Sequence, residues 1–531
     1  MLFTSYNFVG FLIILITLYY IIPKRYQWIL LLAGSYLFYF FAGAFYPLFL
    51  FFTSLTTYLV ARKMDGIKEK QKEYIAAHSG ELTRDQRKEY NKQMKNKRKN
   101  WMIVCLLINF GILAFLKYTN FAIDNINSLL GTLNSTKEFD TLDIILPMGI
   151  SFYTFQSMAY LIDVYWEKVS AQKNFFRYAL FVSFFPQLIQ GPISRYNDLS
   201  KSLYEKHSFD WTNFKNGLTR VLWGYFKKLI IADRIVAAVR SLIESPDYYS
   251  GAFVVLLIVF YGIELYADFT GGIDITIGIA QMLGIKVAEN FERPFFSKNI
   301  AEYWRRWHIT MGTWFKDYVF YPLSISGTMK KITSFSKNRF GKGAAKRVPI
   351  YIATMITWFA TGIWHGANWN FIVWGLMNGV VILVSQEFSP LYEKFHNRFP
   401  KLVKSRPYDA FQVLRTFLLM GSLRLFDCYR DVKTSFYMFF TMFTQFNPFV
   451  ITKKELLDLG LTMTDYAIVF FGVLVMFTVS MLGRSGSVRA KLNNKPYVLR
   501  YAIYVCLIYA VLLFGAYSIG YDATQFIYNQ F

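Results

Sequence analysis

The 531-residue sequence is poor in cysteine and histidine and lacks a hydrolase motif. Its three cysteines, Cys105, Cys428 and Cys506, are widely separated, which excludes a disulfide framework and a cysteine-based metal site. Of the five histidines, His308 and His365 are 57 residues apart and neither has a third ligand residue nearby, so we expect no metal. The absence of a G-x-S-x-G sequence argues against a hydrolase-type serine nucleophile.

Charged residues are also scarce, at 17% of the chain, whereas hydrophobic residues reach 54% and aromatic residues 20%. The apolar residues fall in blocks that are longer than a soluble core needs, and a membrane span requires about 20 mostly apolar residues. This pattern predicts an all-α polytopic membrane protein with roughly ten to twelve transmembrane or re-entrant helices. The expected segments include residues 6–22, 27–45, 47–61, 101–118, 144–164, 175–192, 252–284, 350–386, 411–427, 466–483 and 500–519.

Basic residues exceed acidic ones and give a formal net charge of +24. The lysines and arginines lie in short segments between apolar blocks, which is how membrane orientation is encoded, so we exclude nucleic-acid binding. Residues 62–100 contain thirteen basic against six acidic residues, and residues 324–349 contain seven against none. Both segments are therefore predicted to be cytoplasmic. Residues 62–100 are interpreted as a solvated linker with some helix, or as a docking surface for a soluble partner or anionic lipid.

Two tryptophan-rich segments, residues 301–323 and 357–376, each contain one histidine, His308 and His365. An ionisable side chain at membrane depth costs roughly 2.5–3.5 kcal/mol, so it marks a candidate functional site. We expect residues 350–386 to form a hairpin that crosses outward and returns, with the sequence WHGANW at its turn. His365 then lies in the outer half of the bilayer and His308 on a re-entrant or interfacial helix nearer the inner side. Alternatively, either residue is a buried structural histidine.

Carboxylates interrupt the apolar run at residues 252–284; they are Glu264, Asp268 and Asp274. At membrane depth they should face a bundle interior or a wet cavity. Three roles are open: they cap broken half-helices around residues 271–272, they pair with arginines such as Arg305, or they contact substrate. The proline pair at 186 and 192 is expected to break the helix at residues 175–192.

An imidazole can accept a proton from a hydroxyl and return it to a leaving group near neutral pH. Acyl transfer to an alcohol needs such a base. We therefore predict a direct transfer in which His365 deprotonates the acceptor hydroxyl, which then attacks the carbonyl of a thioester donor.

The ordered sequences ADFTGGIDITIGIAQMLGIKVAENFERPF, EYWRRWHITMGTWFKDYVFYPL and GIWHGANWNFIVWGL resemble the membrane-bound O-acyltransferase family, and most of all its branch of alginate O-acetyltransferases and related envelope polysaccharide acetylases. The likeness in layout covers residues 1–483. It implies a ring of helices around a thinned centre, with a tunnel from a cytoplasmic donor entrance to an outer acceptor funnel. The resemblance places the active-site histidine at His365 and a second functional histidine at His308. Further motif positions, which contact substrate or hold the fold, are Asn290, Trp304, Arg305 and Asp317.

The resemblance also implies one integral-membrane acyltransferase domain over residues 1–531, with the motif-bearing core at 144–376 and a last span within 484–531. It implies a multi-pass protein of the bacterial cell membrane that binds no cofactor and uses an acyl thioester, acetyl-CoA or an acyl-carrier protein, as substrate. Implied partners are an extracytoplasmic acetyltransferase-like protein, a polysaccharide acceptor and membrane lipid. The alternatives are D-alanyl transfer to teichoic acid, as in a sister branch, and a transporter or flippase, because intramembrane carboxylates also mark transport pathways.

Overall fold

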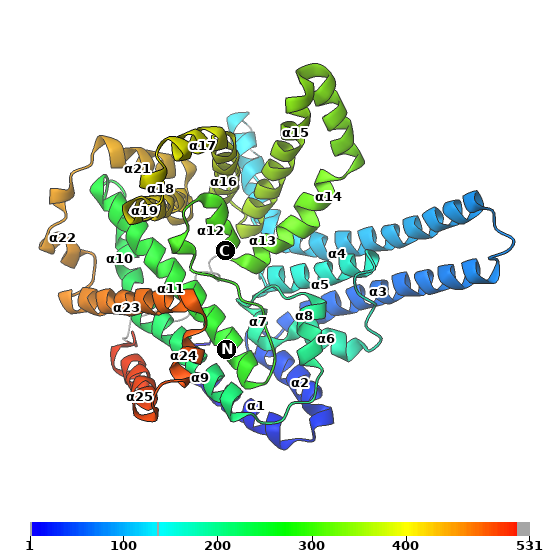
Figure 1. Ribbon diagram of the computed structural model, residues 1–531, viewed down its shortest axis with the longest axis horizontal. Coiled ribbons are helices and arrows are strands. Elements are labelled where there is room, and N and C mark those ends of the chain that lie inside the picture. The colour runs from blue at the N-terminus through cyan, green and yellow to red at the C-terminus, as the bar shows by residue number, and fades with distance from the viewer. Residues whose placement is uncertain (1–2, 135–136, 518–531) are drawn as a thin grey trace. The chain divides into compact units, whose positions relative to one another are not determined.

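The computed structural model describes residues 3–134 and 137–517, which are helical and contain no strand in those ranges (Figure 1). The predicted all-α class is therefore confirmed. The chain divides into two compact units, one formed by Met1–Gly217 with Ile279–Ala288 and the other by Leu218–Gly278 with Glu289–Phe531. The single-domain organisation stays a prediction.

The first unit contains eight α-helices among its described residues, before the start of α9. They are α1 (Tyr6–Ile21), α2 (Gln27–Phe40), α3 (Tyr46–Ala77), α4 (Arg84–Thr132), α5 (Ile150–Tyr165), α6 (Phe175–Ser183), α7 (Phe185–Leu188) and α8 (Tyr196–Leu203). The helix predicted at residues 175–192 is broken, because the chain leaves the helical path at Phe184 and Pro186 lies in the first turn of α7.

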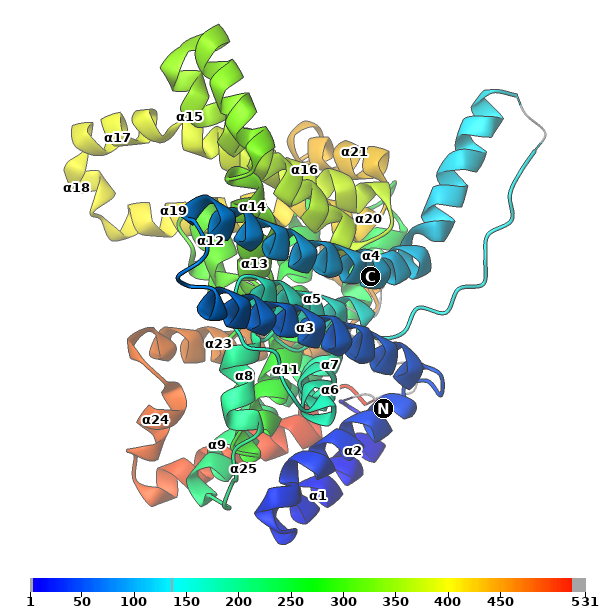
Figure 2. The same ribbon diagram turned by 90° about the vertical axis from the view of Figure 1, so that its right-hand side faces the viewer.

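The basic segment at residues 62–100 is mostly helical, since it forms the end of α3 and the start of α4. Figure 1 and Figure 2 show these two helices side by side, joined by a short connection. The connection ends in a capping box, in which Thr83 and Gln86 satisfy each other's backbone N–H groups. The rings of Tyr74 and Tyr90 pack across the pair with centroids 4.5 Å apart. The predicted linker is thus a helical hairpin.

The described helices of the second unit run from the later part of α9 to α25. Its helices are α9 (Trp211–Tyr225), the π-helical η2 (Phe226–Ala232), α10 (Asp233–Glu244), α11 (Ala252–Met282), α12 (Ile300–Arg306), α13 (Ile309–Phe315), the π-helical η4 (Lys316–Phe320), α14 (Tyr321–Ser324), α15 (Gly327–His365), α16 (Trp369–Glu387), α17 (Ser389–Arg398), α18 (Pro400–Val403), α19 (Arg406–Leu423), α20 (Leu425–Tyr429), α21 (Val432–Thr444), α22 (Lys453–Asp458), α23 (Met463–Leu482), α24 (Val488–Asn493) and α25 (Tyr497–Phe514).

Helix α11 is continuous, so broken half-helices around residues 271–272, one of the three roles considered for the carboxylates, are ruled out. The glycines there serve close packing instead: a Cβ on Gly271 would lie 3.0 Å from the Gly224 carbonyl oxygen and 3.3 Å from Lys228. This contact brings η2 against α11. Asp268 and Asp274 therefore pair with basic side chains of η2 and α9 rather than with Arg305. Glu264 is also buried, but its Oε2 has no hydrogen-bond partner among the described residues.

Two groups of paired charges result, called the charge network below. One joins Arg220 and Lys227 to Asp274 and to the largely exposed Glu289, and the other joins Lys228 to Asp233 and Asp268. Lys228 Nζ lies 2.5 Å from Asp268 and 2.7 Å from Asp233. Asp274 accepts from Arg220 and Lys227, each at 2.7 Å. A buried charge is tolerated only when it is paired, and Asp268 and Asp274 are both paired with cations.

Helices α15 and α16 form the hairpin predicted for residues 350–386. They pack along each other, and their turn at residues 366–368 lies inside the WHGANW sequence. The N-terminal part of α15 holds most of the basic segment 324–349. Helix α15 is kinked within this segment at Gly341, whose φ of +86° favours glycine.

Five described helices are long and apolar enough to cross a bilayer. They are Arg84–Thr132, Ala252–Met282, Trp369–Glu387, Met463–Ser485 and Tyr497–Phe514. The chain is thus a multi-pass membrane protein. The count of ten to twelve segments stays a prediction, because it includes shorter helices such as α1. The last predicted segment, residues 500–519, coincides with α25 as far as Phe514, and residues 518–531 lie outside the described residues.

Candidate active site

His308 lies in a tight turn between α12 and α13, with a positive φ of +46° that is unusual for a residue with a side chain. Asn290 holds this turn. Its backbone carbonyl accepts from the Ile309 N–H at 2.9 Å, and its side-chain oxygen accepts from the N–H and the hydroxyl of Thr310 at 3.1 and 2.9 Å. The same oxygen lies 3.2 Å from Nδ1 of His308. Asn290, a predicted site residue, therefore orients the His308 ring.

The His308 imidazole is 1% exposed and enclosed by aromatic rings. Its ring centroid lies 4.9 Å from that of Phe269 and 6.1 Å from that of Trp364. Burial, and secondly the positive charge of Arg424, hold the pKa of His308 well below its usual range. The ring is therefore neutral near pH 7, with one nitrogen that donates and one that accepts.

His365 is the last residue of α15 and is half-buried. Two tryptophan rings meet it edge to face, Trp364 at 4.9 Å and Trp374 at 4.7 Å between centroids. Because Trp364 also contacts His308, it lies between the two histidines. The structure thus brings together the two residues that the sequence singled out. Their placement at two depths of one path stays a prediction.

The position of His365 depends on close packing between α15 and α16. A Cβ on Gly375 would lie 2.4 Å from the Trp358 carbonyl oxygen and 2.9 Å from Cα of Gly362, and a Cβ on Gly362 would lie 2.5 Å from the Phe371 carbonyl oxygen. Only glycine allows these two backbones to approach so closely. The contact sets His365 and Trp374 against each other.

Trp304 belongs to the same aromatic cluster, which comprises Trp304, Trp358, Trp364 and Trp374 around the two histidines. Its ring centroid is 4.8 Å from that of Trp358 and 5.9 Å from that of Trp374. Its indole nitrogen is buried without a hydrogen-bond partner among the described residues. The predicted residue Arg305 is exposed, and Asp317 lies in the π-helical turn η4. π-Helical turns are frequent at functional sites.

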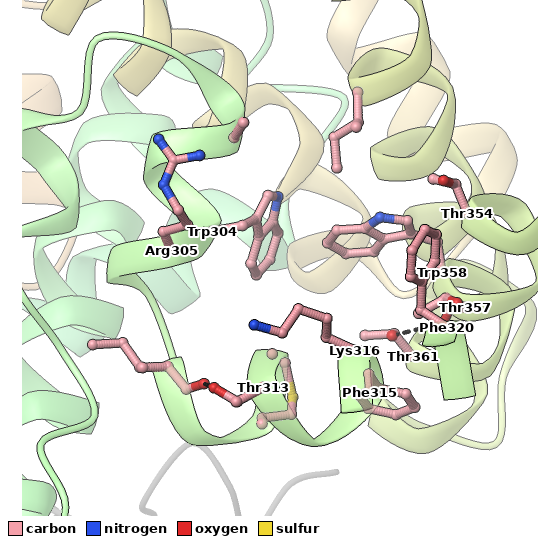
Figure 3. Close-up of a pocket in the computed structure, with 15 residues that line it drawn as sticks. Trp304, Arg305, Thr313, Phe315, Lys316, Phe320, Thr354, Thr357, Trp358 and Thr361 are labelled. Atoms are coloured by element: carbon pink, nitrogen blue, oxygen red, sulfur yellow. Dashed lines mark hydrogen bonds between the residues drawn. The ribbon is translucent and has the colours of Figure 1, made fainter. Parts of the chain in front are cut away.

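A pocket of about 510 Å³ opens beside this cluster (Figure 3). One wall is a threonine face of α15 formed by Thr354, Thr357 and Thr361, and the opposite wall carries Trp304 and Arg305. Lys316 extends from η4 toward Trp304 and Arg305 in Figure 3.

Residues that line the pocket are close in sequence to both histidines. The lining includes Ile309, directly after His308, and Thr361, one helical turn before His365. Neither histidine nor Asp317 is part of that lining. The pocket thus lies at the edge of the aromatic cluster, and its lining includes two cations, Arg305 and Lys316, and the threonine face of α15.

Arg424 and Asp427 are site residues that the sequence analysis missed. Arg424 donates to Asp427 at 2.7 Å, and both side chains are buried. The guanidinium lies 5.0 Å from the Trp374 ring centroid and 5.3 Å from that of Trp307. The signal was an acid three residues after an arginine at the end of an apolar run, a spacing that allows pairing on a helix.

These features define a class: a helical membrane protein in which two neighbouring histidines lie among tryptophans at a helical hairpin. A model of MBOAT, the membrane-bound O-acyltransferase family, matches residues 168–336, a range that contains His308 and ends before His365. The probable alginate O-acetylase AlgI of Pseudomonas syringae pv. tomato is 32% identical over 422 residues, which cover 77% of this chain and 68% of the relative.

Two further relatives carry other names. The peptidoglycan O-acetyltransferase of Helicobacter pylori is 33% identical over 57% of this chain and 58% of its own length. The teichoic acid D-alanyltransferase of Bacillus subtilis is 28% identical over 52% of this chain and 67% of its own length. The chain belongs to the membrane-bound O-acyltransferase family, in the branch of the alginate O-acetylases. It is an O-acyltransferase.

Proposed function

We propose that the chain moves an acyl group, most simply acetyl, from a cytoplasmic thioester donor across the bacterial cell membrane to a hydroxyl of an extracytoplasmic polysaccharide or partner protein. One observation carries the proposal: His308 and His365 share one tryptophan, Trp364, at the turn of the α15–α16 hairpin. A base at such a turn suits a reaction that joins the two sides of a bilayer. The relatives named as alginate and peptidoglycan O-acetylases support acetyl as the group and a glycan as the acceptor.

His365 acts as the general base in this proposal. It takes the proton of the acceptor hydroxyl, whose oxygen forms a bond to the thioester carbonyl carbon. The carbon–sulfur bond then breaks, and the thiolate leaves with the proton that the imidazolium returns. Such a base contributes roughly 10²- to 10⁴-fold to the rate. The donor, acetyl-CoA or an acyl-carrier protein, is a substrate, and no bound cofactor is needed.

His308 has a supporting role. Its neutral ring, oriented by Asn290 and enclosed by Phe269 and Trp364, is suited to hold a substrate oxygen or the thioester carbonyl by a hydrogen bond. The pocket beside the cluster is the proposed chamber for the acyl donor, because Lys316 and Arg305 suit a negatively charged carrier group. A ring of helices with a tunnel through the chain would connect this chamber to both sides.

The first alternative is D-alanyl transfer to teichoic acid. The relatives with that name are 28% and 25% identical, below the 32–33% of the alginate and peptidoglycan acetylases, so acetyl transfer is favoured. The transporter or flippase alternative is less favoured, since two of the three carboxylates that suggested it, Asp268 and Asp274, are paired with lysine and arginine. A transport path needs groups that can exchange partners with a cargo.

The test measures ester groups on envelope polymers in a deletion strain of the source bacterium. Acetate and D-alanine released by mild base are quantified after complementation with the wild type, His365→Ala or His396→Ala, a histidine on α17. We expect O-acetyl esters to be lost on deletion and restored by the wild type and His396→Ala. His365→Ala should restore less than about 1% of them.

Equal amounts of each variant in the membrane fraction, measured by immunoblot, exclude loss of protein as the cause. Wild-type acetylation by His365→Ala would overturn the base assignment. Loss of D-alanyl esters with unchanged O-acetyl esters would overturn acetyl transfer in favour of the first alternative.

A further inference from the structure

The first unit contains an apolar groove that the proposed reaction does not use. It lies between α2, α3 and α6 and has a volume of about 500 Å³. Its lining consists of Trp28, Ile29, Leu32, Ala33, Tyr36, Phe51, Phe175, Phe176 and Ala179. Several of these side chains are exposed, among them Ile29 at 43% and Phe176 at 58%. The groove is therefore an accessible apolar surface rather than a closed core cavity.

The shape of the groove follows helix α2. Trp28, Leu32 and Tyr36 are four residues apart and thus lie along one face, over a length of about 12 Å. A second helix, about 10 Å in diameter, needs a wider surface than one such stripe. A long, narrow and apolar groove instead matches an extended hydrocarbon chain.

The Trp28 end of the groove is basic. The guanidinium of Arg177, the residue after Phe176 on α6, lies 5.5 Å from the Trp28 ring centroid and 5.6 Å from that of Tyr204. The Nε of Arg177 is buried without a hydrogen-bond partner among the described residues. Two more cations, Lys24 and Arg25, directly precede α2.

This arrangement has the order of a membrane interface. Basic side chains lie at the Trp28 end, where headgroups would lie, and the apolar lining continues from there. An arginine held between two rings has its plane fixed, and a phosphate is the anion that such a guanidinium binds best. Charge complementarity thus identifies the ligand as anionic at this end and apolar along the rest.

We propose that this groove binds one anionic glycerophospholipid, with an acyl chain against α2 and the phosphate group on Arg177. The site holds lipid independently of acyl transfer, so it does not rest on the proposed function. Each basic residue near an anionic headgroup contributes a preference of about fivefold over a neutral lipid. Arg177 alone should therefore account for about a fivefold preference.

Native mass spectrometry of the full-length protein tests this site. The protein, purified in detergent and stripped of lipid, is titrated with phosphatidylglycerol or with phosphatidylcholine that has the same acyl chains. We expect one tightly retained phosphatidylglycerol, with about fivefold weaker retention of phosphatidylcholine. Arg177→Gln should equalise the two lipids. Arg415→Gln, which removes an exposed arginine packed on Phe411, is the matched control and should keep the preference.

Filling the groove provides a second test. Ala33→Trp or Ile29→Trp replaces an exposed side chain of α2 and should abolish retention of both lipids. Two such variants guard against misfolding of either one, and each is compared with the wild type by thermal unfolding. Equal retention of both lipids by the wild type, an unchanged preference in Arg177→Gln, or full retention in folded groove-filled variants would each overturn the site.

Discussion

The second unit buries polar side chains in two different ways. The charge network on α11 places carboxylates opposite lysines and an arginine, as in the pairs of Asp274 with Arg220 and Lys227. The aromatic cluster instead surrounds His308 and His365 with rings. A charged side chain paired with an opposite charge is held in place by its partner, whereas a neutral imidazole has a ring nitrogen that can accept a proton. The difference separates a region that holds helices together from the region proposed to catalyse acyl transfer.

Both regions rely on glycine at a helix crossing. Gly224 and Gly271 bring α9 and η2 to α11, and Gly362 and Gly375 bring α15 to α16. Inside a membrane, close backbone approach replaces much of the hydrophobic driving force for helix association. The same packing device therefore supports two regions with opposite chemistry.

The largest effect should follow from removing Lys228, the cation that Asp233 and Asp268 of the charge network share. Lys228→Met leaves Asp268 and Asp233 buried opposite no cation, which costs about 3–5 kcal/mol in free energy of unfolding. Thermal unfolding of the purified protein in detergent measures the loss. Lys331→Met, at an exposed position of α15, should leave the unfolding temperature unchanged. Equal unfolding temperatures for both variants would show that the network is not needed for stability.

A smaller effect is expected where the aromatic cluster depends on packing. Gly375→Ala places a Cβ against the Trp358 carbonyl and Gly362, so α15 and α16 must separate at a cost of about 1–3 kcal/mol. Acyl transfer should fall at least tenfold, because His365 moves relative to Trp374. Gly343→Ala, on α15 with nothing near its added Cβ, serves as the control for thermal unfolding and activity. Wild-type activity in Gly375→Ala would mean that the crossing does not position the site.

The smallest effect concerns the pH dependence of stability. The pKa of His308 is lowered by burial, so below about pH 6.5 the unfolded chain binds a proton that the folded chain does not. The contribution of His308 to the free energy of unfolding is then complete above pH 6.5 and falls by about 1.4 kcal/mol per pH unit below it. His308→Gln should lose less stability than the wild type between pH 7.5 and 5.5, as measured by thermal unfolding. Parallel losses in both proteins would show that His308 is protonated when folded.

Much of the site could be predicted from local sequence. The turn of the α15–α16 hairpin follows from two apolar runs between basic segments, and the break after α6 follows from Pro186. The role of the glycine pair at residues 271–272 stayed open, because glycine serves both helix ends and close helix packing, and only a neighbouring helix distinguishes the two.

The spacing of Arg424 and Asp427 signals a pair, but their place in the site could not be predicted from the sequence, for a related reason. Their pairing is local, but their place beside Trp374 and Trp307 is set by residues fifty or more positions away. The contact of Trp364 with both histidines is likewise a product of packing.

The sequence by itself determined that this protein is helical and multi-pass, where its basic segments lie, and which two histidines interrupt an apolar background, because hydrophobic length, charge and periodicity are local properties. Only the tertiary structure decided which buried charges are paired, which glycines are helix contacts, and that His308 and His365 meet at one tryptophan. Those outcomes depend on contacts between segments distant in the chain, and the energies that select them arise only when the helices pack.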